Sequence, residues 1–283
     1  MKRILVCTDG SAYAGVCCEY ALWAAKRMGA AVDVLYVSDL RQFEIPAIAD
    51  LSGSLGVQPY QGVVGQLQEL EQHKAKLIEE SSRRIFIEQG GMSKEQFSFH
   101  HETGLLVDSI GEFEERAALV FLGKRGENAN FAKGHLGSML ERVVRASTRP
   151  CWITARKFIE PNKIALAFDG GKSGLKALQW IADTPIFKNA EIHVLTVADD
   201  LSENACLGHL SLAEKALQRA GHKPRCEMLN GEVETVIADY VDDFGIDMLI
   251  AGAYGHSRLR ELFIGSTTTE LLRRCRIPVL CFR

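Results

Sequence analysis

Short apolar runs alternate along the whole chain with longer segments in which apolar residues recur every three or four positions. The short runs are typical of buried strands, because a parallel sheet that is covered on both faces needs apolar residues at successive positions. The longer segments are typical of amphipathic helices. This alternation predicts an α/β fold in which helices cover both faces of a parallel sheet.

The pattern also predicts where each element lies. In the first half we expect strands at residues 4–7, 32–37, 97–101, 119–122 and 151–154, and helices at 11–28, 105–115 and 138–146. In the second half we expect strands at 164–168, 192–197, 225–229, 248–251 and 279–282, and helices at 173–183, 203–220, 233–244 and 266–274. Ser11 is expected to cap the first helix and Gly29 to end it.

The two halves of the chain repeat one another. A shift of 160 residues lays Arg3-Ile-Leu-Val-Cys-Thr-Asp9-Gly10 over Lys163-Ile-Ala-Leu-Ala-Phe-Asp169-Gly170, and a shift of 128 residues lays Gly137-Ser138 over Gly265-Ser266. Shared spacing at both ends of each half indicates a duplicated domain. The length of 283 residues agrees, because it suits two domains of about 140 residues. We expect a first domain at residues 1–156 and a second at 161–283, with a linker around 155–162.

The first half carries an extended middle segment at residues 40–93 that the second half lacks. Prolines and glycines mark a loop at its start, and a long polar helix is expected at 66–89. The apolar residues of that helix are expected on one face, at Leu67, Leu70, Leu77 and Ile78. Such a stripe suits packing on the domain, and a partner surface is the alternative.

A glycine-rich loop follows the fourth strand of each half. The second half has Gly252-Ala-Tyr-Gly255 and, after nine residues, Gly265-Ser266-Thr267; the first half has Gly123-Lys-Arg-Gly126 and, after ten residues, Gly137-Ser138-Met139. Glycine lets the backbone approach an anion, and a helix start offers unpaired N–H donors. Both loops therefore predict phosphate binding, although neither has the spacing of a Walker loop or of a dinucleotide fingerprint.

The first loop departs from the second in two ways. It is one residue longer, and Met139 stands where the second loop has the hydroxyl of Thr267. The second half is therefore expected to be the better phosphate site. The first loop compensates with an extra glycine and three cations, namely Gly134, Lys124, Arg125 and Lys133.

An aspartate, Asp9 or Asp169, follows the first strand of each half. Ligands of a doubly wound sheet bind beyond the carboxyl ends of the strands, where the winding reverses. If the first and fourth strands are neighbours, each aspartate faces a glycine loop and can accept hydrogen bonds from adenine or ribose. A turn or a helix cap is the alternative role for an aspartate that precedes glycine.

The Gly-x2-Gly-x9-Gly-Ser/Thr pattern, the strand-one aspartate and the pre-helix Gly231 resemble the universal stress protein family, in a tandem form with two family domains in one chain. The resemblance covers nearly all of the chain and is more specific in the second half. It implies two Rossmann-like domains of the adenine nucleotide alpha hydrolase type, each with a five-stranded parallel sheet in the order 3-2-1-4-5. It also implies binding of ATP or AMP, with Mg²⁺ accompanying the phosphates.

Carried over residue by residue, the resemblance implies two sets of ligand contacts. The set in the second half is Asp169, Val197, Gly252, Gly255, Gly265, Ser266 and Thr267. The set in the first half is Asp9, Val37, Gly123, Gly126, Gly137 and Ser138. The valines would present backbone groups to the adenine edge, and the glycines and hydroxyls would hold ribose and phosphates.

Three functions fit these features. The favoured one is a nucleotide-binding stress-response or signalling protein without fast turnover, in which no residue is catalytic. A ligand-free protein-interaction module is one alternative, and a slow ATP-using enzyme of the ATP pyrophosphatase-like superfamily is the other. That enzyme needs a strand-one Ser-Gly-Gly-x-Asp-Ser loop, and Asp169-Gly-Gly-Lys-Ser173 matches it only in part.

Composition limits the partners and the cellular compartment that we expect for the protein. A net charge of −3 argues against general affinity for nucleic acid or for an anionic membrane. We expect no membrane span and no signal peptide, and hence a cytoplasmic protein. The eight cysteines form no Cys-x-x-Cys pair and are expected to be reduced and packed as small apolar residues. His100 and His101 are expected to face opposite sides of a strand, and no metal site is expected.

The last strand of each domain should lie at a sheet edge, which needs covering. In the family that the chain resembles, this edge forms homodimers. We therefore expect the two halves to pair as an intramolecular pseudo-dimer through residues 151–154 and 279–282. A homodimer of the whole chain is a further expectation.

Overall fold

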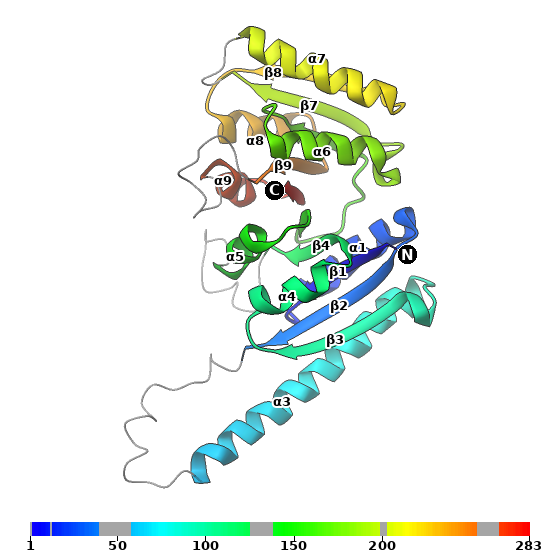
Figure 1. Cartoon of the computed structure of the whole chain (residues 1–283), viewed down its shortest axis with the longest axis vertical. Coiled ribbons are helices and arrows are strands. Elements are labelled where there is room, and N and C mark those ends of the chain that lie inside the picture. Colours follow the sequence, from blue (N-terminus) through cyan, green and yellow to red (C-terminus); the bar gives the residue numbers. More distant parts are fainter. Residues whose placement is uncertain (1, 12, 40–57, 125–137, 199–202, 254–265) are drawn as a thin grey trace.

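All strands in the described part of the chain join one mixed sheet (Figure 1). The computed structural model describes residues 2–11, 13–39, 58–124, 138–198, 203–253 and 266–283. The first half contributes β1 (Arg3–Thr8), β2 (Ala31–Ser38), β3 (Phe97–Thr103), β4 (Ala117–Gly123) and β5 (Cys151–Thr154). The second half contributes β6 (Lys163–Ala167), β7 (Glu191–Val197), β8 (Arg225–Leu229), β9 (Met248–Gly252) and β10 (Val279–Phe282).

The strand order is β3-β2-β1-β4-β5-β10-β9-β6-β7-β8. Within each half every pair of neighbouring strands is parallel, and the order by half is 3-2-1-4-5, as predicted. The winding reverses between β1 and β4 in the first half and between β6 and β9 in the second. These two switch points are where a ligand is expected.

The halves meet through β5 and β10, which pair antiparallel with Trp152 opposite Leu280 and Cys151 opposite Cys281. Each half thus covers the sheet edge of the other, and the predicted intramolecular pairing is observed. The homodimer of the whole chain stays a prediction.

Helices cover both faces of the sheet (Figure 1). One face carries α1 (Ala14–Met28), α3 (Gln58–Arg83), α6 (Lys172–Asp183) and α7 (Glu203–Arg219). The other carries α4 (Leu106–Glu114), α5 (Ser138–Ala146), α8 (Val233–Asp243) and α9 (Ser266–Arg274). Short helical turns lie at Arg84–Gln89, Lys94–Gln96 and Pro185–Phe187. The apolar core on each face contains residues of both halves, so the core continues through the junction.

Trp152 is the centre of the core at the junction. Its side chain is 0% exposed and stacks on Phe121, with ring centroids 5.1 Å apart. The ring centroid of Trp23 lies 5.9 Å away in an edge-to-face arrangement, and that of Phe187, in the second half, lies 6.2 Å away. Buried aromatic rings carry much of the free energy of a core. We infer that the two halves stabilise each other at this point.

The first helix begins later than the sequence predicts. It starts at Ala14 behind Tyr13, which makes no side-chain cap, so the prediction that Ser11 caps it is wrong. The reason is that the N–H of Ser11 donates to Oδ1 of Asp9 at 2.9 Å, while its carbonyl accepts from the N–H of Ala14 at 2.9 Å. Gly29 ends the helix in the left-handed conformation (φ 60°), as predicted.

The long polar helix also differs from expectation. It begins at Gln58, its first turns reach beyond the sheet (Figure 1), and a π-helical turn at Arg84–Gln89 continues it. Ile78 is buried, but Leu70 and Leu77 are 59% and 53% exposed, so the predicted common face is wrong. The inward face instead carries Ala75 and Ile78, which are buried, and Glu71, which accepts hydrogen bonds from β2.

Candidate functional site

Each half brings its strand-one aspartate close to the start of its glycine loop. In the second half, β6 and β9 are parallel neighbours with Ala167 opposite Ala251. Asp169 follows β6 and Gly252 ends β9, so both leave the same end of adjacent strands. The first half repeats the arrangement with β1 and β4. The topological condition for a shared crevice, which the sequence left open, is met in both halves.

The carboxylate of Asp169 lies on the first turn of α6. Its Oδ1 accepts the N–H of Gly171 at 2.8 Å, as the Oδ1 of Asp9 accepts the N–H of Ser11. A Cβ at Gly171 or at Gly174 would lie 3.0 Å from this oxygen, so a side chain at either position would crowd the carboxylate. Both aspartates therefore hold turns, which is the alternative role. A carboxylate has about four acceptor positions, so this turn does not exhaust Asp169.

Gly252 joins the first turns of two helices. A Cβ at Gly252 would lie only 3.1 Å from Cβ of Ser173 in α6. The hydroxyl of Thr268, in the first turn of α9, donates to the carbonyl oxygen of Gly252 at 3.0 Å, and Thr268 is 6% exposed. Two helix N-termini thus meet at the end of β9. Their N–H groups and dipoles favour an anion at that place.

The first half lacks the hydroxyl anchor. By the shift of 128 residues, Leu140 stands where the second half has Thr268, and Leu140 is buried among apolar side chains. The ammonium of Lys124, a cation expected to serve the first loop, donates to the carbonyl oxygen of Cys275, just past the end of α9. The first loop therefore begins with a contact to the other half.

The remaining predicted residues take the following places. Val37 lies near the end of β2 and Val197 ends β7, and both pack on the core beneath α4 and α8. Gly123 ends β4; Ser138 begins α5; Ser266 begins α9, and Thr267 follows it. Four of the predicted glycines lie outside the described residues, namely Gly126, Gly137, Gly255 and Gly265. So do three further residues of the first loop, namely Arg125, Lys133 and Gly134.

A different side chain packs over the turn in each half. In the second half a Cβ at Gly170 would lie 2.4 Å from Nε2 of His209 on α7, whose ring meets the edge of Phe168 at 6.1 Å. In the first half a Cβ at Gly10 would lie 2.7 Å from Cδ1 of Ile78 on α3. Sequence reasoning missed His209, because the repeat gives no register between α3 and α7. It also missed the bond of Thr268, because residue spacing does not show which carbonyl a hydroxyl reaches.

A polar cluster fills the space between α3 and the carboxyl ends of β2 and β3. The hydroxyl of Ser38 lies 2.8 Å from Oε2 of Glu71 and 2.7 Å from Nε2 of His101, and the hydroxyl of Tyr36 also bonds to Glu71. Burial alone would raise the pKa of Glu71, but the hydrogen bonds from Tyr36 and Ser38 lower it. The cluster fixes α3 over the first half.

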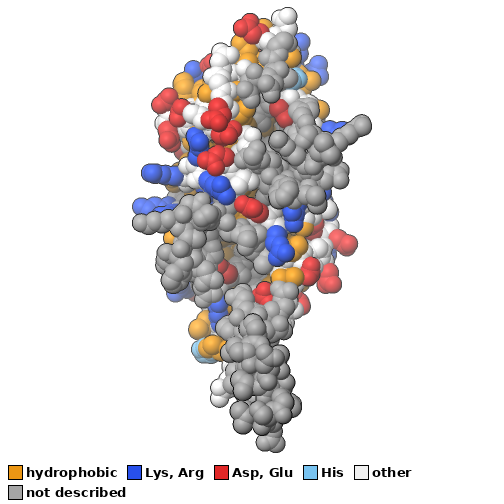
Figure 2. Space-filling model, turned by 90° about the vertical axis from the view of Figure 1, so that its left-hand side faces the viewer, with side chains coloured by type: hydrophobic (Ala, Val, Ile, Leu, Met, Phe, Trp, Pro, Cys, Tyr) orange, Lys and Arg blue, Asp and Glu red, His pale blue; other side chains and the backbone are white. Residues whose placement is uncertain are grey.

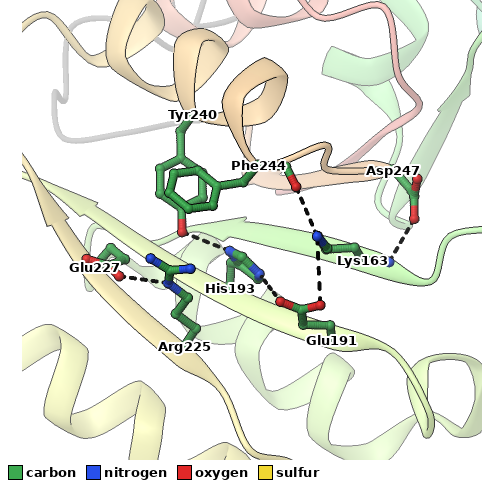
Figure 3. A network of polar contacts seen from close by, with 8 residues as sticks. All are labelled: Lys163, Glu191, His193, Arg225, Glu227, Tyr240, Phe244 and Asp247. Carbon is green, nitrogen blue, oxygen red and sulfur yellow. Dashed lines mark hydrogen bonds and ion pairs between the residues drawn. The ribbon is translucent and has the colours of Figure 1, made fainter.

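A second polar network lies at the opposite end of the sheet, near the amino ends of β6, β7 and β8 (Figure 3). His193 is 0% exposed, with Nδ1 2.8 Å from the hydroxyl of Tyr240 and Nε2 2.8 Å from Oε1 of Glu191. Arg225 bonds to Glu227 at 2.8 Å and lies over the ring of Phe244. Ligands of such a sheet bind beyond the carboxyl ends of the strands, so a network at the amino ends of β6, β7 and β8 has a structural role.

The first half has an equivalent network around Asp33. This carboxylate pairs with Arg3 and lies 3.3 Å from Nε2 of His100. Burial would raise the pKa of Asp33, but the hydrogen bond and charge of Arg3, with those of His100, outweigh it and lower the pKa. His100 packs on Phe113 of α4, whereas His101 stacks on Tyr36, so the two rings face opposite sides as predicted.

The eight cysteines are all free, and seven of them are buried. Burial raises the pKa of Cys18 and of Cys151 to about 12 and that of Cys275 to about 11. These thiols therefore act as small apolar residues, as predicted. The described residues contain no cluster of three potential metal ligands.

The surface and the helices add two observations. On the face in Figure 2, acidic and basic side chains of the described residues lie interspersed. In the part of the chain that the structure describes, every helix is too short or too polar to cross a bilayer.

Comparisons with known proteins agree with this fold. The sequence model of the universal stress protein family matches residues 1–155 and 202–283. Universal stress protein Slr1230 of Synechocystis sp. is 39% identical over 289 residues, covering 100% of both chains. A universal stress protein structure from Archaeoglobus fulgidus superimposes with a TM-score of 0.69 at 20% identity, covering 99% of this chain and 96% of its own.

A functionally unknown protein of Pseudomonas aeruginosa PAO1 superimposes with a TM-score of 0.62 at 16% identity, covering 100% of this chain and 92% of its own. At 20% and 16% identity, these two structures show that the fold is shared. The family match covers most of the chain in two regions, and the full-length relative has the same family name. The chain therefore belongs to the universal stress protein family, with two family domains in tandem.

Proposed function

We propose that the second half binds an adenine nucleotide, ATP or AMP, and that the chain acts in the cytoplasm in a stress response or in signalling, without fast turnover. The observation that carries the proposal is the position of Gly252, between the first turns of α6 and α9 and beside the turn of Asp169. Family membership supports it.

Different parts of the crevice suit different parts of the nucleotide. The remaining acceptor positions of Asp169 suit the hydroxyl and amino donors of adenosine. The start of α9, with Ser266 and Thr267, suits the phosphates, because it offers N–H groups, hydroxyls and the positive end of a dipole. When bound, Mg²⁺ would neutralise part of the phosphate charge. These are binding and positioning roles, so the proposal includes no catalytic residue.

The second half is the stronger of the two sites. Thr268 ties the first turn of α9 to Gly252, whereas Leu140 provides no such bond in the first half. A preorganised site binds more tightly, because less freedom is lost on binding. The first-half set, from Asp9 to Ser138, would bind more weakly.

The test compares Asp169→Asn with its matched control in the first half, Asp9→Asn. Asparagine keeps an oxygen for the N–H of Gly171 or Ser11, so the turn stays while the charge and an acceptor are lost. Hydrogen bonds to charged groups contribute about 1.5–3 kcal/mol, so ATP affinity should fall roughly 10- to 150-fold in Asp169→Asn and little in Asp9→Asn.

Calorimetric titration of the full chain with ATP and AMP, with and without Mg²⁺, measures these affinities. Unchanged ATP binding in a stable Asp169→Asn variant, or a larger loss in Asp9→Asn, contradicts the assignment of the site. If the wild-type protein binds neither nucleotide, the proposed function is wrong and the ligand-free interaction module is favoured. Chromatography of the ATP after prolonged incubation tests turnover, and multiple turnovers within minutes would favour the enzyme.

A further inference from the structure

We propose that Nδ1 of His209 forms a hydrogen bond with the nucleoside part of the ligand in the second half. This inference rests on the proposed function and adds to it a residue that neither the repeat nor the loop pattern indicates. The bond would make adenosine recognition specific to the second half.

The ring of His209 is held against the turn that carries Asp169. His209 projects from α7, and a Cβ at Gly170 would lie 2.4 Å from Nε2, 2.6 Å from Cδ2 and 2.8 Å from Cε1 of its ring. Gly170 has φ 71°, so the backbone conformation and the space there both require glycine. The imidazole and the turn are therefore in direct contact.

The ring nitrogen Nδ1 is buried and has no hydrogen-bond partner among the described residues. An imidazole nitrogen is either a donor or an acceptor in every protonation state. An unmet one that is shielded from water is costly, so native structures seldom keep it without a reason. The two other such atoms are the indole nitrogens of Trp23 and Trp152 in the junction core. Of the three, the nitrogen of His209 lies at the candidate site.

In the described part of the first half, an apolar side chain takes the place of the imidazole. There the side chain over Gly10 is Ile78, with the Cε of Lys74 next to it. The methyl of Ile78 forms no hydrogen bond. The two halves thus keep the aspartate turn and differ in the side chain above it.

The position of His209 selects the nucleoside over the phosphates. The ring contacts Gly170 and Phe168, on either side of Asp169. The phosphates are assigned to the start of α9, which Thr268 ties to β9. Nε2 faces the turn and Nδ1 lies on the other side of the ring, so the partner that Nδ1 suits is a ribose hydroxyl or an adenine nitrogen that packs against that side of the imidazole.

The experiment uses His209→Phe, His209→Asn and His209→Gln in the full chain. Phenylalanine keeps the ring and removes both nitrogens; the asparagine amide lies near the place of Nδ1, and the glutamine amide near that of Nε2. We expect His209→Phe to bind adenosine and ATP about two- to tenfold more weakly. His209→Asn should restore most of the affinity, and His209→Gln should not. Ile78→Val is the matched control and should change neither affinity.

A second measurement does not depend on the variants folding. In wild-type protein, the imidazole ¹⁵N signal of Nδ1 of His209 should shift on adding adenosine and stay unchanged with pyrophosphate. Equal affinities across stable variants, or no shift with adenosine, overturn this inference, while a loss in Asp169→Asn would still support the site. Wild-type protein that binds neither adenosine nor ATP overturns the inference and the proposed function together.

Discussion

Replacing Trp152 with alanine tests whether the two halves unfold as one unit. The side chain is 0% exposed and contacts aromatic rings of both halves. Tryptophan or phenylalanine to alanine changes in a core cost about 3–5 kcal/mol, because they lose apolar burial and leave a cavity. We take about 4 kcal/mol as the expected loss of unfolding free energy.

The size of the unfolding unit converts this loss into a shift of Tm. At roughly 2.1 cal/mol/K per residue, 283 residues give an unfolding entropy of about 0.6 kcal/mol/K. If the whole chain unfolds together, a loss of about 4 kcal/mol lowers one Tm by about 7 °C. If the first half unfolded alone, half the entropy would give a fall of about 14 °C, with no change in the second half. The continuous core predicts the first result.

Differential scanning calorimetry measures both outcomes, and comparing the calorimetric with the van't Hoff enthalpy reports the size of the unit. Phe86→Ala is the matched control, because Phe86 is also 0% exposed but packs on Phe97 at the outer end of the first half. It should lower the same single transition. Two transitions in the wild type, with Trp152→Ala moving only one, would refute the coupling of the halves.

Three further predictions concern the polar groups. The lowered pKa of Asp33 stabilises the folded chain above the pKa of the unfolded carboxyl, 3.8, and this stability is lost as the pH falls through the lower folded value. Urea midpoints from pH 7 to 3 should therefore fall below about pH 4, and less steeply in Asp33→Asn. Tyr240→Phe removes the hydroxyl partner of the buried His193 and should cost about 1–3 kcal/mol in urea unfolding; an unchanged midpoint contradicts this. Thr268→Val should weaken ATP binding by about two- to tenfold in calorimetric titration, whereas the control Leu140→Val should not. Equal ATP binding in both variants would mean that the hydroxyl of Thr268 does not contribute to the site.

The strands and the strand order could be predicted because apolar runs and parallel topology leave few choices. The element at Cys151–Thr154 and the helix at Ser138–Ala146 agree with the structure to the residue. The neighbouring positions of Asp169 and Gly252 follow from the switch-point rule. These features depend on periodicity and on chain order, and both can be read from one sequence.

The remaining features depend on side chains that act against their usual tendency. Glu71 lies on the inward face of α3, where Tyr36 and Ser38 donate to it. Ala75 and Ile78 are buried on the same face, and Leu70 and Leu77 are exposed. Polarity alone places glutamate on the outer face. The location of His209 over Gly170 depends on how α7 packs, and the repeat carries no information about that.

The contacts across the junction give the first half a structural role that requires no ligand. Lys124 of the first half donates to the carbonyl oxygen of Cys275 at the end of α9, and Arg283 of the second half donates to the carbonyl oxygen of Arg145 in the last turn of α5 at 2.6 Å. The last carbonyls of a helix lack partners within it, and a cation there also offsets the negative end of the dipole.

Each half thus caps the helix that begins at the glycine loop of the other half. A first half that bound no nucleotide would still hold α9, and with it the first turn that Thr268 ties to Gly252. This support does not require the hydroxyls at the start of α9, so the repeat can keep its strand order and junction although Leu140 and Met139 stand where the second half has Thr268 and Thr267.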